Sequence, residues 1–220
     1  MLTRADRTVD NALEVLEDIR DVGVTHIGFK DVGIAPARAA DVVLRIKELG
    51  ATSYLEVVST TAADVLRSAR LGRELGFDRL LGGSLAQLDD VMRLLEGSAT
   101  AYLPFPGEPF GHPTKLRGSA EAIERDCRRA RERGAAGCDL LAHRTVEADP
   151  IELVRAARRG IGDGVLLVAG GVASPAHVRA LAEAGADAFT VGSAAFDGSF
   201  APAAGSSLRA QLGAVLDACR

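Results

Sequence analysis

The sequence is poor in aromatic residues and contains no tryptophan. Aromatic residues make up 4% of its 220 residues, although 47% are hydrophobic. Its core must therefore consist of Val, Leu, Ile and Ala, the composition that buried parallel strands favour, which indicates an α/β fold rather than a β-sandwich. Cys127, Cys138 and Cys219 are odd in number and have no Cys-x-x-Cys spacing, so we expect reduced thiols.

Other absences exclude classes of function. The formal net charge is −4 with both signs interspersed, so we expect no nucleic-acid partner. No apolar run approaches the roughly 20 residues that span a bilayer, and no signal peptide is evident, so we expect a soluble, cytoplasmic protein without a membrane partner. No residues show metal-ligand spacing, and we expect no cofactor; the sequence leaves open a divalent ion held by Asp31, Glu56 and His143.

Apolar segments of strand length alternate with amphipathic segments of helical length along the chain. We expect strands at 1–4, 25–30, 53–58, 77–81, 101–104 and 138–143, and within 166–172 and 188–194. Helices are expected from near Val9, at 36–50, 62–75, 84–96, 119–133 and 208–219, and after Asp149 and Ser174. The segment 105–115 holds several prolines and glycines, so we expect a loop there, which would suit a lid.

Eight strands alternating with eight helices predict a (β/α)8 TIM barrel that forms one domain over residues 1–220. A doubly wound open sheet is the alternative. The absence of a G-x-G-x-x-G motif after the first strand favours the barrel. The late position of the glycine-rich strand ends also favours it, since barrels commonly bind phosphate there.

Two glycine-containing strand ends predict a phosphate site. Gly170 and Gly171 follow one apolar strand, and Gly192 and Ser193 follow the next. Glycine lets an anion approach the main-chain N–H groups closely, and a following helix adds partial positive charge. We expect the two loops to bind a phosphate group together.

An internal match suggests a second anion site. The residues Gly76, Asp78, Gly83 and Ser84 recur 109 positions later as Gly185, Asp187, Gly192 and Ser193. A spacing near half the chain length is typical of a duplicated half-barrel. On this interpretation Gly82, Gly83 and Ser84 form a second phosphate-binding corner.

The segments 168–172 and 184–194 resemble the last two strands of the ribulose-phosphate-binding barrel superfamily. Its members include the histidine-biosynthesis isomerase and cyclase, the tryptophan-pathway barrels, hexulose-phosphate synthase and phosphogluconate-type aldolases. The resemblance implies that Gly170, Gly171, Gly192 and Ser193 bind the substrate phosphate through main-chain N–H groups. The repeat is similar to that of the histidine-pathway pair, which implies a second phosphate near Gly83.

The catalytic motifs of those families are not matched. The histidine-pathway pair has aspartates on strands 1 and 5, whereas here Asp6 lies beyond the first strand and the fifth has none. The Asp-x-Lys-x-x-Asp motif of the decarboxylase and hexulose-phosphate synthase group is absent after the third strand. Where phosphogluconate-type aldolases carry a Schiff-base lysine, this chain has His143. Lys30-Asp31 is similar to part of the Gly-x-Lys-Asp motif of pyruvate-dependent lyases, but on a different strand.

Ionisable residues at strand ends are the candidates for catalysis, because these ends face the active-site mouth of a barrel. Lys30 suits a Schiff-base or electrophilic role, Glu56 lies within an apolar strand as a candidate base, and His143 suits proton transfer. Each has a structural alternative as an ion-paired or hydrogen-bonded group. The candidate substrate-binding residues are Thr3, Arg4, Asp31, Ser59 and Arg144.

The sequence therefore predicts an enzyme, a lyase of the aldolase kind or an isomerase, that acts on a small phosphorylated sugar or sugar-acid. The reaction would be aldol cleavage or isomerisation through an enediolate or Schiff-base intermediate. The alternatives are a histidine-pathway-type isomerase of a bisphosphorylated ligand and a non-catalytic phospholigand-binding barrel. A homodimer is left open.

Overall fold

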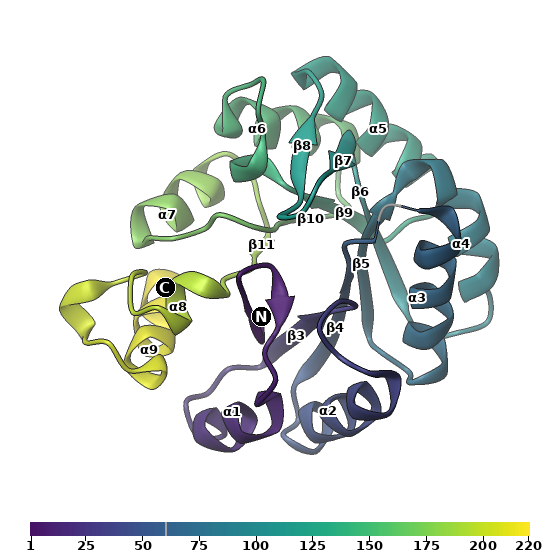
Figure 1. The fold of residues 1–220 in the computed structure, drawn as a ribbon. Helices are drawn as coiled ribbons and strands as arrows, with labels where there is room; N and C mark the ends of the chain where they lie inside the picture. The colour runs from purple at the N-terminus through teal and green to yellow at the C-terminus, as the bar shows by residue number, and fades with distance from the viewer. Residues whose placement is uncertain (60) are drawn as a thin grey trace.

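Parallel strands stand around a common centre, with helices outside them (Figure 1). The structure is a computed structural model and describes residues 1–59 and 61–220. One parallel sheet contains, in order, β3 (His26–Lys30), β4 (Thr52–Val57), β5 (Arg79–Ser84) and β6 (Ala101–Phe105). A second contains β9 (Gly137–Leu140), β10 (Val165–Val168) and β11 (Ala188–Phe189).

Main-chain hydrogen bonds join the two sheets into a ring. Ala136 N donates to Tyr102 O at 3.0 Å, which connects β9 to β6. On the other side the first residues of the chain fill the gap: Leu2 N donates to Gly28 O at 2.7 Å, and the Met1 nitrogen donates to Val191 O at 2.8 Å. The first segment thus completes the predicted (β/α)8 barrel.

Helices follow the strands as the periodicity predicts. They are α1 (Ala12–Ile19), α2 (Pro36–Glu48), α3 (Ala62–Glu74), α4 (Leu88–Leu95), α5 (Ala120–Glu132), α6 (Pro150–Ile161), α7 (Pro175–Glu183), α8 (Ser193–Phe196) and α9 (Leu208–Ala218), with 3-10 turns η1 (Leu85–Gln87), η2 (Ala142–Arg144) and η3 (Pro202–Ala204). Side chains of Ser119, Asp149 and Ser174 accept hydrogen bonds from the first turns of α5, α6 and α7, which explains where these helices begin. Every helix in the described part of the chain is too short or too polar to span a bilayer.

The start of the chain differs from the prediction. Instead of a helix from near Val9, β1 (Thr3–Arg4) and β2 (Arg7–Thr8) form an antiparallel hairpin, and α1 begins at Ala12. The Thr8 hydroxyl group donates to Lys30 O at 2.8 Å and accepts from Lys30 N at 2.9 Å. These bonds hold β2 beside β3, and the hairpin turn at Ala5 and Asp6 has positive φ angles of 48° and 62°.

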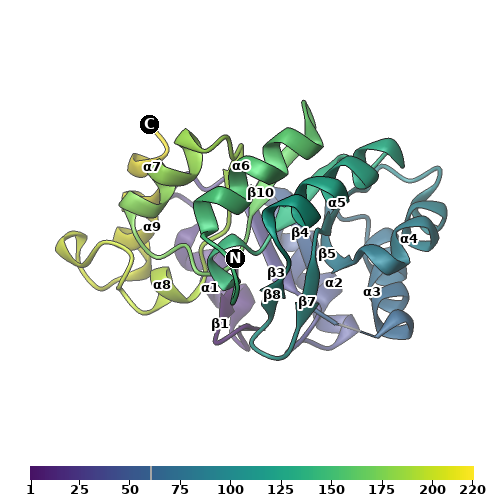
Figure 2. The same cartoon turned by 90° about the horizontal axis from the view of Figure 1, so that it is seen from above.

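The proline-rich segment after β6 contains no helix, as predicted. It forms a second hairpin from β7 (Glu108–Phe110) and β8 (Lys115–Arg117). This hairpin and the β1–β2 hairpin lie at the same end of the barrel (Figure 2), where Thr114 N donates to an Asp6 carboxylate oxygen at 3.0 Å.

The repeat in the sequence has a local explanation in the structure. Gly50, Gly76, Gly134 and Gly185 each have positive φ and donate an N–H to the carbonyl of the third residue before, at the end of a helix. Asp78 and Asp187 then accept from N–H groups of Ser53 and Leu166 on the neighbouring strands. The match between Gly76 and Gly185 is thus explained by a helix-to-strand turn. Within the described residues this turn occurs at four places around the barrel, and not only at the two matched positions.

We predict that replacing Tyr102 by Phe destabilises the fold more than replacing Tyr54 by Phe. The Tyr102 hydroxyl is buried and donates to Gly82 O at 2.9 Å, so its loss leaves a buried carbonyl without that donor. The expected cost is about 1–2 kcal/mol. The Tyr54 hydroxyl meets His26 in an exposed contact, and its loss should cost less than about 0.5 kcal/mol. Urea denaturation measures both, and equal losses would contradict the assignment.

Candidate functional site

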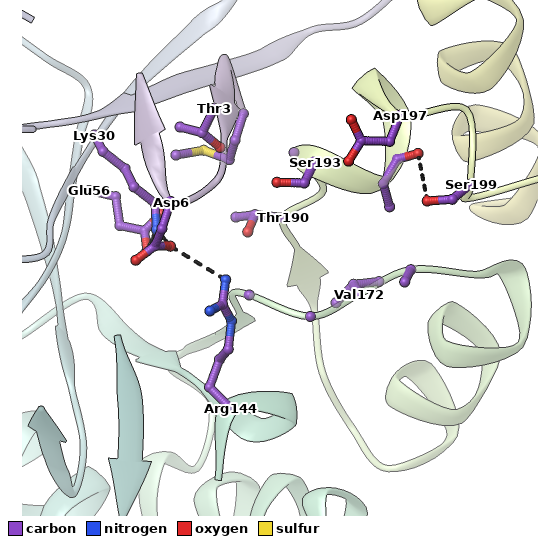
Figure 3. Close-up of a pocket in the computed structure, with 16 residues that line it drawn as sticks. Thr3, Asp6, Lys30, Glu56, Arg144, Val172, Thr190, Ser193, Asp197 and Ser199 are labelled. Carbon is purple, nitrogen blue, oxygen red and sulfur yellow. Dashed lines mark hydrogen bonds and ion pairs between the residues drawn. The ribbon is translucent and has the colours of Figure 1, made fainter. Parts of the chain in front are cut away.

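A cavity of about 290 Å³ opens at the carboxyl ends of the barrel strands (Figure 3). Four ionisable side chains line one part of it, and two glycine-containing loops line another. The residues are Asp6, Lys30, Glu56 and Arg144 in the first group, and 170–173 and 192–194 in the second, with Met1, Thr3, Thr190, Asp197 and Ser199 beside them.

Lys30 lies at the centre of the ionisable group. Its Nζ is 2.6 Å from Asp6 Oδ1 and 3.3 Å from Glu56 Oε1. The register of β3 and β4 pairs Lys30 directly with Glu56, which accounts for the second contact. Burial works to lower the pKa of Lys30, but the carboxyl groups of Glu56 and Asp6 outweigh it and raise the pKa above its ordinary value. Lys30 is therefore an ammonium group at neutral pH.

Glu56 has the opposite balance. Its side chain is 1% exposed, and Oε1 contacts Lys30 as an ion pair without hydrogen-bond geometry. Burial raises the pKa of Glu56, and the Lys30 ammonium offsets only part of this effect. A carboxyl group with a raised pKa beside a fixed ammonium is suited to accept a proton from a bound ligand.

Asp6 joins this group although the sequence analysis did not select it. Its carboxylate accepts from Lys30 and Thr114 N and pairs with Arg144 Nη2 at 3.4 Å. Burial works to raise the pKa of Asp6, but Lys30, the Thr114 N–H and Arg144 bring it below the ordinary value. The signal was a carboxylate directly after the first strand, where the sequence predicted a helix from near Val9 rather than the β1–β2 hairpin.

Both glycine loops line the same cavity, with backbone geometry that excludes larger residues. Gly170 and Gly171 have φ of 73° and 77°, and a Cβ on Gly171 would lie 2.7 Å from His143 Cβ. A Cβ on Gly192 would lie 2.5 Å from Thr3 Oγ1. Within residues 1–59 and 61–220, the N–H groups of Gly170, Gly171, Gly192 and Ser193 donate to no other group of the protein. These four donors are available to a ligand.

His143 does not join Lys30 and Glu56. The sixth strand ends at Leu140, three residues earlier than predicted, and His143 lies in η2 behind Gly171. Its ring stacks on His177 at a centroid distance of 4.6 Å, and its buried Nε2 has no hydrogen-bond partner in the part of the chain that the structure describes. Burial, and then His177, lower the pKa of His143. The structure therefore places this histidine beneath the glycine loop.

At the predicted second phosphate corner, other protein atoms lie close to the Cβ positions of Gly82 and Gly83. A Cβ on Gly82 would lie 2.4 Å from Val57 O and within 3 Å of the Phe105 ring, and Gly83 packs against Val65 and Tyr102. The Ser84 hydroxyl accepts from Ala86 N, which begins η1. None of the three residues 82–84 lines the cavity that holds Lys30.

The predicted substrate-binding residues separate into two groups. Thr3 and Arg144 line the cavity, and Arg4 pairs with Asp197 at its edge at 2.6 Å. Asp31 and Ser59 instead face an outer cavity of about 530 Å³ beside α2 and α3. There Asp31 accepts from Val58 N, Ser59 Oγ and Ser68 Oγ. Asp31, Glu56 and His143, the three residues considered as metal ligands, therefore lie in different surroundings.

Asp139 on β9 is a second acidic residue that the sequence analysis missed. It is 0% exposed, and neither carboxyl oxygen has a hydrogen-bond partner among the described residues. Burial, with the charge of Glu56, raises the pKa of Asp139 well above its ordinary value, while Lys30 works in the opposite direction. Burial without a hydrogen-bond partner therefore favours the neutral form of Asp139. The signal in the sequence was the one that selected Glu56, a carboxylate within an apolar strand.

Comparison with known proteins identifies the fold. No protein-family model and no curated protein matches the chain. Among solved structures, orotidine 5′-phosphate decarboxylase from Pyrococcus horikoshii OT3 matches with a TM-score of 0.71 and 16% identity, over 96% of this chain and 95% of that one. A chain of the Amycolatopsis orientalis BexX/CysO complex matches with a TM-score of 0.63 and 20% identity, over 96% and 84%. Mandelate oxidase with (S)-2-phenylpropionate matches with 0.65 and 18%, over 98% and 71%.

These likenesses confirm the TIM-barrel prediction. At such low identity they concern the fold alone. The finer resemblance to the ribulose-phosphate-binding superfamily stays a prediction.

We predict that replacing Asp139 by Asn changes how stability depends on pH. The raised native pKa means that the folded protein binds a proton which the unfolded chain releases above about pH 4. Folding of the wild type is therefore disfavoured progressively as pH rises from there toward the native pKa. The variant cannot bind this proton, so it does not lose stability in this way. The difference in unfolding free energy between the variant and the wild type should therefore increase by up to about 1.4 kcal/mol per pH unit.

Urea denaturation between pH 4 and 8 measures this difference. The exposed Asp163→Asn variant serves as a control for the loss of an aspartate and should follow the wild type. Parallel curves for wild type and Asp139→Asn would contradict a neutral Asp139.

Proposed function

We propose that the protein is an enzyme that removes a proton next to the carbonyl group of a small phosphorylated sugar or sugar-acid. The resulting enediolate would proceed to isomerisation or to aldol cleavage. The observation that carries this proposal is the placement of the Lys30 ammonium and the Glu56 carboxyl in the same cavity as the glycine loops.

The glycine loops are suited to the phosphate group. Four main-chain N–H groups have no partner within the described ranges 1–59 and 61–220. Arg144 lies beside Gly170, where an added Cβ would be 2.9 Å from its Nε. Main-chain donors and a guanidinium group together match the several acceptor oxygens of a phosphate. A structurally similar protein is named for a phosphorylated ligand, orotidine 5′-phosphate, which is compatible with this use of the fold.

The size of the site favours a small substrate with one phosphate. A volume of about 290 Å³ lies at the lower limit of the range of ligand pockets, roughly 300–1,000 Å³. Residues 82–84 line no part of this cavity, so among the described residues it offers the one set of free main-chain donors in the glycine loops. This argues against a bisphosphorylated ligand of the histidine-pathway type.

Lys30 and Glu56 supply complementary roles in proton abstraction. Glu56 accepts the proton from the carbon, and the electrons of the C–H bond move onto the carbonyl oxygen. The Lys30 ammonium stabilises the negative charge that develops there. Schiff-base formation needs a neutral amine, whereas Asp6 and Glu56 hold Lys30 protonated, so the charge balance favours the enediolate route.

We predict that the protein exchanges a carbon-bound hydrogen of such a substrate with solvent. The experiment incubates it with a panel of keto-sugar and keto-acid phosphates in D2O and follows loss of the α C–H signal by NMR. Replacing Glu56 by Gln should slow exchange by about 10²–10⁴-fold, because the base is lost while the shape is kept. The Glu74→Gln variant, on the exposed side of α3, is the matched control and should exchange at the wild-type rate.

Two results would contradict the proposal. Exchange that persists in Glu56→Gln would remove Glu56 from the base role. Tight binding of phosphorylated ligands without exchange in any of them would favour a non-catalytic binding barrel. Borohydride trapping distinguishes the routes, since covalent labelling of Lys30 would establish the Schiff base in place of the enediolate.

A further inference from the structure

Asp139 is a buried acid that the proposed reaction does not use directly. Its neighbour in β9, Cys138, faces Cys127 of α5 on the outer side of the strand. Because side chains alternate along a strand, Asp139 points to the interior of the barrel. There it is fully buried, and both carboxyl oxygens lack a hydrogen-bond partner among the described residues.

Among the described residues, Lys30 is the cation whose charge acts on the Asp139 carboxyl group. The Met1 amino group lies near Lys30 and Glu56, and burial lowers its pKa to about 6. Lys30 lies on β3, Glu56 on β4 and Tyr102 on β6, and the charges of Lys30 and Glu56 act on the Asp139 carboxyl group. Lys30 is already shared by two carboxyl groups, at 2.6 Å and 3.3 Å. A carboxylate at Asp139 would have neither a hydrogen-bond donor nor a cation of its own, which is costly in an apolar interior.

We propose that Asp139 is a positioning residue that remains a neutral acid inside the barrel and keeps the site free of an additional negative charge while the enediolate forms. This inference rests on the proposed function. Before the reaction, Lys30 balances one of the two carboxylates Asp6 and Glu56, and Arg144 pairs with Asp6. An uncharged Asp139 leaves this balance intact.

The reaction moves a negative charge without creating one. As Glu56 takes the proton and becomes neutral, the charge appears on the substrate oxygen, which Lys30 stabilises. A carboxylate at Asp139 would oppose the new charge in a medium of low dielectric constant. Ionisation of Asp139 should therefore lower the rate without any contact between Asp139 and the substrate, whose cavity it does not line.

The first test compares pH profiles of solvent exchange for wild type, Asp139→Asn and Asp163→Asn, each normalised to its own maximum. As Asp139 ionises, the wild-type rate should fall to a lower plateau, because the added charge opposes the developing enediolate without removing a catalytic group. The Asp139→Asn variant lacks this group, so the part of the alkaline fall that belongs to Asp139 should disappear, and only the fall from deprotonation of Lys30, whose pKa is raised, should remain at higher pH. Asp163→Asn should reproduce the wild-type profile, and an alkaline limb that is unchanged in Asp139→Asn would overturn the proposal.

The second test needs no substrate. Infrared difference spectra at neutral pH should show a protonated carboxyl C=O band in the wild type that is absent from Asp139→Asn and present in Asp163→Asn. The Glu56→Gln variant separates any contribution of Glu56 to the same region. Absence of an Asp139 band would overturn the proposal on its own. If the Asp139 band is present but no substrate exchanges its hydrogen with solvent, the proposed function is wrong and the neutral state of Asp139 is not.

Discussion

The ammonium group of Lys30 is held between two carboxyl groups inside a ring of apolar strands, and the candidate site depends on this arrangement. Asp6 fixes it from the β1–β2 turn and Glu56 from the neighbouring strand. The pairing stabilises a buried cation that would otherwise be costly, and it keeps the amine protonated. The same pairing leaves Glu56 only partly compensated, so one lysine determines the chemistry available to both acids.

The position of Asp6 shows how the barrel brings distant segments to this lysine. Its carboxylate connects the first hairpin to β3, to the β7–β8 hairpin through Thr114 and to η2 through Arg144. The Thr8 hydroxyl group secures the hairpin to the Lys30 main chain. Arg144 then extends from Asp6 toward Gly170 and so connects the ionisable group to the glycine loops within one cavity.

Strand and helix periodicity was sufficient to predict the barrel, and strand ends were sufficient to find Lys30, Glu56 and the glycine loops, because parallel strands bring their carboxyl ends together. Asp6 was not predictable in this way, since its role depends on a left-handed turn and on Thr8 pairing with a distant strand. Asp139 was missed because burial on the inner face of a strand is a property of the closed ring.

Two further predictions, for His143 and for the corner at Gly83 and Ser84, depended on where strands end and on a repeat in the sequence. His143 was expected at a strand end, but β9 ends at Leu140 and the chain turns into η2, which carries the ring behind the glycine loop. The match at Gly83 and Ser84 predicts a second anion site, which stays a prediction, and residues 82–84 line no part of the cavity that holds Lys30. A repeated glycine pair indicates that the two segments have similar backbone geometry. It does not show whether the neighbouring side chains leave room for an anion.

A crystal structure with inorganic phosphate tests the central claim most directly, because that claim joins an anion-binding end and a proton-transfer end in one cavity. The account predicts a phosphate ion bound to the N–H groups of Gly170, Gly171, Gly192 and Ser193, with Lys30 and Glu56 facing the same cavity. A phosphate ion bound at Gly83 and Ser84 instead, or an ion at the glycine loops with Lys30 and Glu56 closed off from it by intervening side chains, would contradict it.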